Sequence, residues 1–145
     1  MVSKLWKCAA VLVLALGACA EPPPPTTVQL SVAGAEDMNG GLPAKVKVYY
    51  LLSTAKFNGT DFFAVFDQPE ATLGADLAAV DEYLLAPGKS VADAKSFDLT
   101  PVAIGVVAAF REIGQPGWRA TAPLAPNSAN PVAVTLSGNE VGIGQ

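Results

Sequence analysis

Histidine is absent from the sequence, and cysteine occurs only twice, as Cys8 and Cys19, among 145 residues. Without histidine, a Ser-His-Asp triad, an imidazole metal ligand and a His proton shuttle are all excluded. Zinc would have to bind through carboxylates alone, which is poor zinc chemistry, and the chain has no Gly-x-Ser-x-Gly nucleophile elbow. We therefore expect a protein that is not an enzyme, with no catalytic residues, no metal site and no cofactor.

Positive charge is also scarce, because nine Lys and Arg residues against 13 Asp and Glu residues give a net charge of −4. Two of the lysines, Lys4 and Lys7, lie at the extreme N-terminus and would be lost with a cleaved leader, so the mature protein would be still more acidic. An acidic protein is poorly suited to binding nucleic acid or anionic lipid by charge. We expect no nucleic-acid partner.

The N-terminal segment has the pattern of a secretory leader. Lys4 and Lys7 flank the start of an apolar run over residues 9–16, which leads into Leu16-Gly17-Ala18-Cys19. A basic start, a short apolar run and small residues before a cleavage site are typical of a signal peptide. The run is much shorter than the roughly 20 residues that a transmembrane helix needs.

The Leu-small-small-Cys motif resembles the lipobox of bacterial lipoproteins. That resemblance implies cleavage before Cys19 and acylation of its thiol and of the new amino group. The alternative is a chance cysteine at the end of an ordinary secretory signal. If Cys19 is acylated, no disulfide can form within the mature chain, although its compartment would allow one.

This interpretation divides the chain into three parts, of which only the last is expected to build a core. The parts are a lipoprotein signal peptide over residues 1–18, an acylated cysteine and Pro-rich tether over residues 19–27, and a folded domain over residues 28–145.

Cys19 and the residues after it predict how the folded domain is attached to a membrane. Several acyl chains would attach the protein stably to a membrane. Pro22–Pro25 would extend as a stiff polyproline II tether. Ala20 stands where, by resemblance to enterobacterial lipoproteins, Asp would favour the inner membrane. We therefore expect a lipid anchor on the periplasmic face of the outer membrane.

The folded domain consists mainly of short alternating or apolar runs separated by Gly and Pro. Such runs are typical of β-strands, and with one helical insertion near residues 56–80 they predict a mainly β, two-sheet sandwich of seven to eight strands. Residues 75–83 also fit a helix, and we favour a strand at the end of that segment. The most apolar run, 104–111, is expected to be a central strand buried on both faces. The expected strands are 28–32, 45–52, 81–85, 96–99, 104–111, 118–122, 132–136 and 140–143.

The connection between the first two strands is longer than a hairpin requires. Asn39-Gly40-Gly41 favours a tight turn, but the connection spans residues 34–43 and is interpreted as a projecting loop. A loop on a rigid sandwich is a usual place for recognition residues, and Met38 would be a pliable apolar contact there. The alternative is a solvated connection with no partner.

Aromatic residues mark the helical insertion. Phe57, Phe62, Phe63 and Phe66 are expected to pack the insertion against the sheet, because aromatic side chains at helical spacing usually point inward. The alternative is a hydrophobic docking surface. Asp61 is expected to lie at the start of a short helix, where the dipole favours an acid.

Two pairs of adjacent residues have ordinary structural interpretations. Trp118 is expected to pack and Arg119 to meet Glu112 or another acid across the sheet, the alternative being that they bind a partner. Asp81 and Glu82 are adjacent on a predicted strand and therefore point to opposite faces. They cannot act together as the two carboxylates of a glycosidase.

The order and spacing of several segments resemble one family across nearly the whole mature chain. It is the TssJ (SciN, VasD) family, the outer-membrane lipoprotein of bacterial type VI secretion systems. Besides the lipobox, the matching segments are NGGLPAKVKVYYLL, FNGTDFFAVF, TLGADL, LLAPG, AIGVVAAFREI and GWR.

The resemblance implies a transthyretin-like sandwich with an added helical piece and a structural role. It implies that the protein anchors the periplasmic C-terminal domain of the inner-membrane protein TssM at the outer membrane, with TssL joining indirectly. The alternative is a lipid-anchored periplasmic sandwich that binds a small ligand. The partner-binding residues implied by the family are those of the first loop: Ala35, Glu36, Asp37, Met38, Asn39, Gly40, Gly41 and Leu42.

Overall fold

The computed structural model describes residues 17–145, so the predicted signal peptide lies outside the described residues except at its last two positions. After the tether, the described chain is mainly β. The strands are β1 (Thr26–Gly34), β2 (Ala44–Leu51), β3 (Leu77–Leu85), β4 (Ser90–Phe97), β5 (Ala103–Ala108), β6 (Arg119–Pro123), β7 (Ala129–Ser137) and β8 (Glu140–Gly144).

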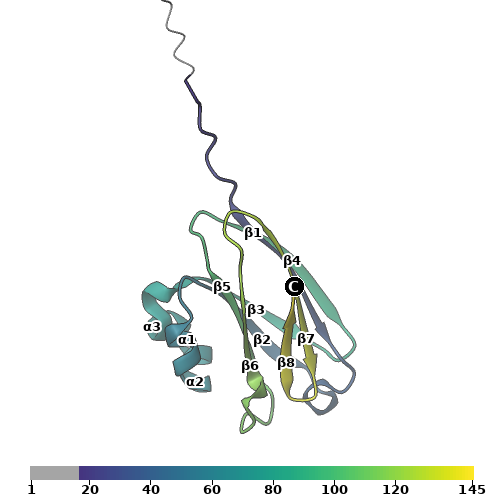
Figure 1. Ribbon diagram of the computed structural model, residues 1–145. Coiled ribbons are helices and arrows are strands. Elements are labelled where there is room, and N and C mark those ends of the chain that lie inside the picture. The colour runs from purple at the N-terminus through teal and green to yellow at the C-terminus, as the bar shows by residue number, and fades with distance from the viewer. Residues whose placement is uncertain (1–16) are drawn as a thin grey trace, which may run out of the picture.

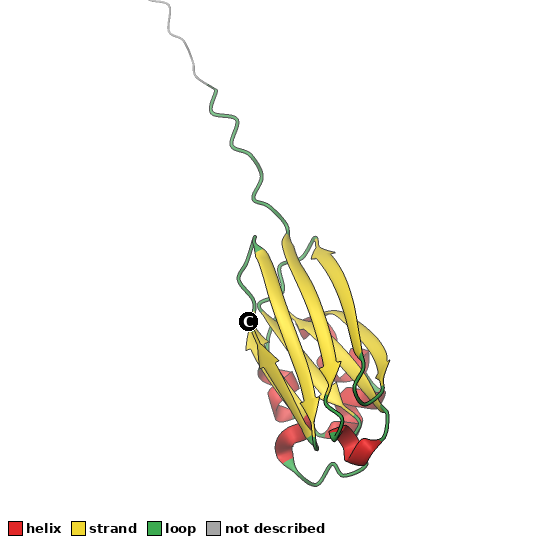
Figure 2. Cartoon of the chain, turned by 90° about the vertical axis from the view of Figure 1, so that its right-hand side faces the viewer, coloured by secondary structure: helices red, strands yellow, loops and turns green. Residues whose placement is uncertain are grey.

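These strands form two four-stranded sheets that pack face to face (Figure 1), with the orders β4-β1-β7-β8 and β3-β2-β5-β6. Neighbouring strands are antiparallel except β1 and β7, which are parallel. Figure 2 looks onto one sheet, with the helices behind the strands and the tether leaving one end of the sandwich. The expected mainly β, two-sheet sandwich is confirmed.

β3 and β4 begin well before the positions that the sequence pattern predicted. β3 begins at Leu77, so the ambiguous segment is strand from there onward and pairs along β2. β4 begins at Ser90, where no strand was expected, and pairs with β1 from Ala33 back to Thr26. In both cases cross-strand pairing, which is not visible in local spacing, determines the conformation.

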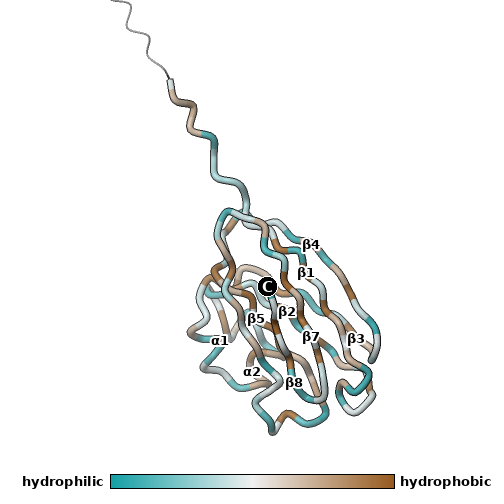
Figure 3. The backbone as a smooth tube through the Cα atoms, turned by 45° about the vertical axis from the view of Figure 1, so that its right-hand side comes forward, coloured by the Kyte–Doolittle hydropathy of each residue, from teal (hydrophilic) through white to brown (hydrophobic). Residues whose placement is uncertain are grey.

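The space between the sheets is filled by apolar side chains from alternate strand positions. On β2, Val46, Val48 and Tyr50 belong to this core, whereas Tyr49 belongs to the cluster on the opposite face, because successive side chains of a strand point to opposite faces. β5 is buried over its whole length, which confirms the expected central strand. Figure 3 shows hydrophobic stretches of the chain gathered in strands such as β5.

Short helices cover the outer face of the β3-β2-β5-β6 sheet (Figure 1). Asp61 caps the second of them, because its Oδ1 accepts a hydrogen bond from the Ala64 N–H at 2.9 Å. Gly74, with φ of +53°, ends the third. The first helix was not expected separately. The helices are α1 (Ala55–Gly59), α2 (Phe62–Asp67) and α3 (Pro69–Leu73), and the 3₁₀ turns are η1 (Met38–Gly41), η2 (Gly74–Asp76) and η3 (Pro116–Trp118).

The aromatic residues of the insertion do not all pack inward. Phe57 is fully buried, and Phe62 and Phe66 are partly buried with their rings stacked at 5.1 Å. Phe63, however, is 62% exposed, so its predicted packing is wrong. Phe63 follows Phe62 directly and turns about 100° away from the buried face, where Val65 takes the inward position instead.

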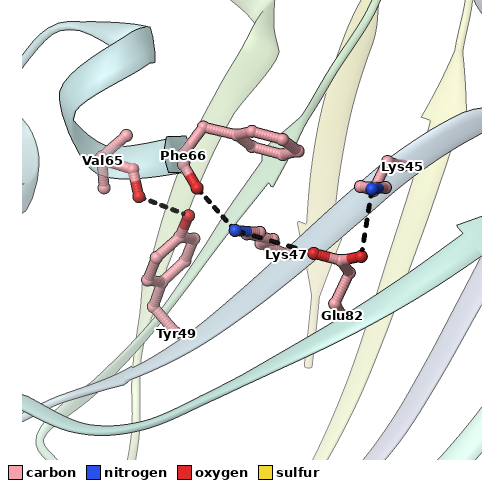
Figure 4. A network of polar contacts seen from close by, with 6 residues as sticks. All are labelled: Lys45, Lys47, Tyr49, Val65, Phe66 and Glu82. Atoms are coloured by element: carbon pink, nitrogen blue, oxygen red, sulfur yellow. Dashed lines mark hydrogen bonds and ion pairs between the residues drawn. The ribbon is translucent and has the colours of Figure 1, made fainter. Parts of the chain in front are cut away.

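Hydrogen bonds tie α2 to the sheet beneath it (Figure 4). The Tyr49 hydroxyl donates to the Val65 carbonyl at 2.9 Å, and Lys47 Nζ donates to the Phe66 carbonyl. Lys47 also lies 3.6 Å from a carboxylate oxygen of Glu82. The last carbonyls of α2, which have no partner within the helix, are therefore satisfied by side chains of β2.

Polar pairs close the side of the sandwich where β3 and β4 form the edges. Lys95 Nζ lies 2.7 Å from Asp81 Oδ2, and the Tyr83 hydroxyl donates to Asp93 Oδ2 at 2.8 Å. Asp81 thus faces β4, whereas its neighbour Glu82 lies on the helix-covered face of the sheet. This confirms that the two acidic residues point in opposite directions.

Candidate partner-binding loops and lipid anchor

The tether leaves the sandwich at the start of β1. Cys19 is exposed, and Pro22–Pro25 extend beyond it without regular structure. Asn127, in the loop before β7, fixes the end of the tether: its Nδ2 donates to the Pro24 carbonyl and its backbone N–H donates to Thr26 Oγ1, both at 2.9 Å. The direction in which the tether departs is therefore set by the fold.

Two global observations apply to residues 17–145. No helix there is long and apolar enough to cross a membrane, and no group of three or more acidic, Cys or His residues is placed to hold a metal ion.

The loop between β1 and β2, residues 35–43, lies at the end of the sandwich opposite the tether (Figure 1). It is tied to the β7–β8 hairpin. The Ala35 N–H donates to the Leu136 carbonyl at 2.8 Å, and the Asn39 N–H donates to the Gly138 carbonyl at 2.7 Å. The 3₁₀ turn η1 lies inside this loop. The loop is therefore a fixed element and not a free projection.

Burial corrects two of the predicted contact residues. Met38 is 0% exposed and belongs to the core between the sheets, and Asn39 is 4% exposed. Met38 therefore cannot offer its side chain to a partner in this conformation. The prediction relied on the apolar character of Met38. A methionine in a loop can pack into the core as readily as it can project from the surface.

The remaining residues of the predicted set are accessible. Glu36, Asp37, Gly40, Gly41 and Leu42 are exposed, the last by 40%, and Ala35 is half-buried. Two carboxylates and one leucine on a fixed backbone form a small surface that suits a protein partner. The structure thus brings together the accessible part of the predicted site.

A second loop adds residues that sequence reasoning did not assign to the site. Arg111 and Glu112, just after β5, line a hollow of about 240 Å³ together with Asn39, Gly40 and Asn139. Glu112 was one of the acidic residues that Arg119 was expected to meet. The clue in the sequence was the two opposite charges at the end of the most apolar run. Charged residues at that point indicate that the buried strand has ended and a loop has begun.

Arg119 makes different contacts from those predicted. Its Nη1 donates to the carbonyls of Phe57 and Thr60 at 2.9 and 2.8 Å, and its guanidinium lies 4.6 Å from the Trp118 ring. The expected acidic partner is wrong. Carbonyls at the end of α1 lack partners within the helix, and a guanidinium with several donors satisfies them. Arg119 therefore has a structural role.

The titratable groups with shifted pKa values are structural as well. Burial raises the pKa of Tyr49 and of Tyr50 well above the ordinary value. Burial, followed by its hydrogen bond to Asp93, likewise raises the pKa of Tyr83. The same hydrogen bond from Tyr83 lowers the pKa of Asp93. These groups lie in the core and at the β3–β4 edge, away from the loop surface.

Comparison with known proteins identifies the family. A family model described as type VI secretion lipoprotein (VasD, EvfM, TssJ) matches residues 26–139. The match covers the sandwich from β1 to β7 and ends just before β8. The chain belongs to this family of type VI secretion lipoproteins. A comparison with curated protein sequences gives no match.

Solved structures agree with this assignment. The type VI lipoprotein TssJ1 of Pseudomonas aeruginosa is 29% identical, with a TM-score of 0.79, and the similarity covers 83% of this chain and 96% of that chain. A chain of a structure described as a type VI membrane complex is 28% identical, with a TM-score of 0.71 and coverages of 83% and 98%. A chain of a structure described as the TssM C-terminal domain (869–1107) from EAEC is 28% identical, with a TM-score of 0.69 and coverages of 80% and 98%.

Proposed function

We propose that this protein is a structural component of the type VI secretion membrane complex. Acyl chains on Cys19 hold it on the periplasmic face of the outer membrane. The loop end of the sandwich binds the periplasmic C-terminal domain of TssM, and TssL joins through TssM. The exposed residues of the β1–β2 loop, with Ala35 at its start, provide the first part of the contact.

The observation that carries this proposal is the position of the loop relative to the anchor. β1 has nine residues and carries the chain about 30 Å from one end of the sandwich to the other, at about 3.3 Å per residue. The tether departs at one end and the β1–β2 loop lies at the other (Figure 1). A protein anchored through Cys19 therefore presents this loop away from its lipid, toward a partner that reaches across the periplasm.

One of the similar structures supports TssM as that partner. The chain that matches there is about as long as the present sandwich, since 80% of this chain covers 98% of it. A fragment numbered 869–1107 is much longer than that. We infer that the matched chain is a second component of a structure that also contains the TssM fragment.

The small-ligand alternative lacks a supporting observation. The interior is filled by tightly packed side chains from both sheets, and the hollow near the loops is lined by polar residues at the surface. A ligand-binding sandwich would need apolar space between its sheets.

The proposed function is tested by affinity purification of the full-length, acylated protein from native membranes. We expect TssM to co-purify, with TssL present only when TssM is present. A different outer-membrane lipoprotein with the same tag is the control. Recovery without TssM, under conditions in which the secretion machine is assembled, would contradict the proposal.

A further inference from the structure

Asn39 connects three segments at the loop end of the sandwich. Its side-chain Oδ1 accepts a hydrogen bond from the Arg111 N–H at 2.8 Å, and its Nδ2 donates to the Pro43 carbonyl at 2.9 Å. Its own backbone N–H donates to the Gly138 carbonyl at 2.7 Å. One buried residue, through its side chain and its backbone, thus holds together the β1–β2 loop, the β5–β6 loop and the β7–β8 turn.

The conformation of Asn39 restricts which residue can do this. Its φ of +50° and ψ of +37° lie in the left-handed region. Apart from glycine, asparagine is among the residues that tolerate this region best. The side chain at this position must also both donate and accept a hydrogen bond. Alanine would lose both hydrogen bonds, and aspartate would keep only the acceptor for the Arg111 N–H.

The hollow beside Asn39 has unpaired charges on its rim. Arg111 and Glu112 are both exposed, and neither forms an ion pair with any residue in the range 17–145. The hollow of about 240 Å³ has room for a single large side chain. A guanidinium and a carboxylate at its rim suit a side chain that both donates and accepts hydrogen bonds.

We propose that the binding surface for the protein partner extends from the β1–β2 loop across this hollow to Arg111 and Glu112, with Asn39 as the positioning residue that aligns the two loops. The partner inserts one polar side chain between Arg111 and Glu112. This inference rests on the proposed function, because it assumes that the loop end binds a protein. It adds to that function a second loop and the reason why an inaccessible residue matters for binding.

Binding measurements test this inference with the full-length, acylated protein in lipid nanodiscs and the TssM periplasmic C-terminal domain as the probe. Arg111→Ala and Glu112→Gln should each weaken binding about tenfold, as expected for contacts at the centre of an interface. Both side chains are exposed, so the melting temperature should not change. Glu70→Gln, an exposed substitution on α3, is the matched control and should leave the affinity unchanged.

A double-mutant cycle tests whether Asn39 positions Arg111 for binding. Asn39→Ala, measured well below its melting temperature, should weaken binding, and adding Arg111→Ala to it should cost less than the same change in the wild type, because the misaligned loop no longer makes the contact. Asn39→Asp, which keeps the acceptor, should retain more affinity than Asn39→Ala. A merely structural Asn39 would lower the melting temperature and leave the affinity of the folded protein unchanged.

The outcomes separate the two proposals. If the wild type binds and substitutions at Glu36, Asp37 and Leu42 weaken binding but those at Arg111 and Glu112 do not, the extended surface is wrong and the proposed function stands. If the wild type itself does not bind the TssM domain, the proposed function is wrong and the extended surface is overturned with it. If Asn39→Ala does not fold, the affinities of Arg111→Ala and Glu112→Gln still test the extended binding surface.

Discussion

Gly105, in the middle of β5, lies directly against the ring of Phe57 from α1. A Cβ atom at Gly105 would be 2.7 Å from Phe57 Cζ, and 2.9 and 3.0 Å from two further ring carbons. Phe57 is itself fully buried. The helical insertion can therefore sit this close to the sheet only because position 105 has no side chain.

We predict that Gly105→Ala destabilises the protein by about 1–3 kcal/mol, because overpacking a filled core forces side chains or backbone to shift. The free energy of unfolding from urea denaturation measures this. Gly142→Ala on β8 is the matched control, since its Cβ would meet nothing closer than 3.8 Å. Equal stability of the two variants would show that α1 is not held against β5 as described.

Met38→Ala should be still more damaging than an ordinary loop substitution. Removing a fully buried methionine typically costs about 2–5 kcal/mol, whereas Met38→Leu, which conserves volume, should cost less than about 1.5 kcal/mol. Thermal unfolding distinguishes the two. A loss below 0.5 kcal/mol for Met38→Ala, the range of an ordinary surface change, would mean that the side chain projects after all.

The tyrosines predict the behaviour of the protein at high pH. Tyr49, Tyr50 and Tyr83 are the only three in the chain, and all have raised pKa values in the folded state. The unfolded chain loses its phenolic protons near pH 10 while the folded protein keeps them. The unfolded state then binds fewer protons, so the free energy of unfolding falls as the pH rises above about 10.

Absorbance at 295 nm, which reports tyrosinate, measures this directly. We expect little phenolate signal at pH 10 to 11 in the folded protein and a cooperative rise when the fold is lost. Tyr83→Phe should make the decline in stability less steep. Reversible titration of all three tyrosines near pH 10 with the fold intact would contradict the burial described for them.

Cys19 is predicted to be the membrane anchor. Cys19→Ser should release the protein from the membrane fraction, because the hydroxyl cannot carry the thioether-linked lipid. Since Cys19 is exposed and lies outside the sandwich, the circular dichroism spectrum and melting temperature should stay the same. A variant that still sediments with outer membranes would show that the domain is held there by something else.

Strand positions were largely predictable from the sequence because period-two alternation is local. β2 was recognised this way, whereas β5 was recognised by its continuous apolar run. β4 was missed at Ser90 because its pattern is weak and only its pairing with β1 makes it a strand. Phe63 was predicted to pack inward because the neighbouring phenylalanines have helical spacing. A helix as short as α2 buries only one side, and Phe63 lies on the other.

The candidate site shows the same limit. The position of the β1–β2 loop followed from its length and its glycines, but the burial of Met38 and Asn39 depends on side chains from distant strands. Asn39 bonds to Arg111, which is 72 residues away. Arg111 and Glu112 were therefore missed as part of the surface, because their proximity to the first loop is created by the sandwich and not by spacing along the chain.

The exposed residues of the β1–β2 loop are the centre of the account. Deleting the loop is not a suitable test, because it would also remove Met38 from the core. The triple substitution Glu36→Ala, Asp37→Ala and Leu42→Ala changes only exposed side chains. It should lower the melting temperature by no more than about 5 °C, since surface changes rarely exceed about 0.5 kcal/mol each.

The most direct measurement is the dissociation constant of the full-length, acylated protein for the TssM periplasmic C-terminal domain, with and without this triple substitution. We predict a complex that forms at micromolar concentration or below and is weakened at least about tenfold by the three substitutions. No detectable complex with the wild type, or a complex whose affinity the substitutions leave unchanged, would contradict the claim that this loop holds TssM at the outer membrane.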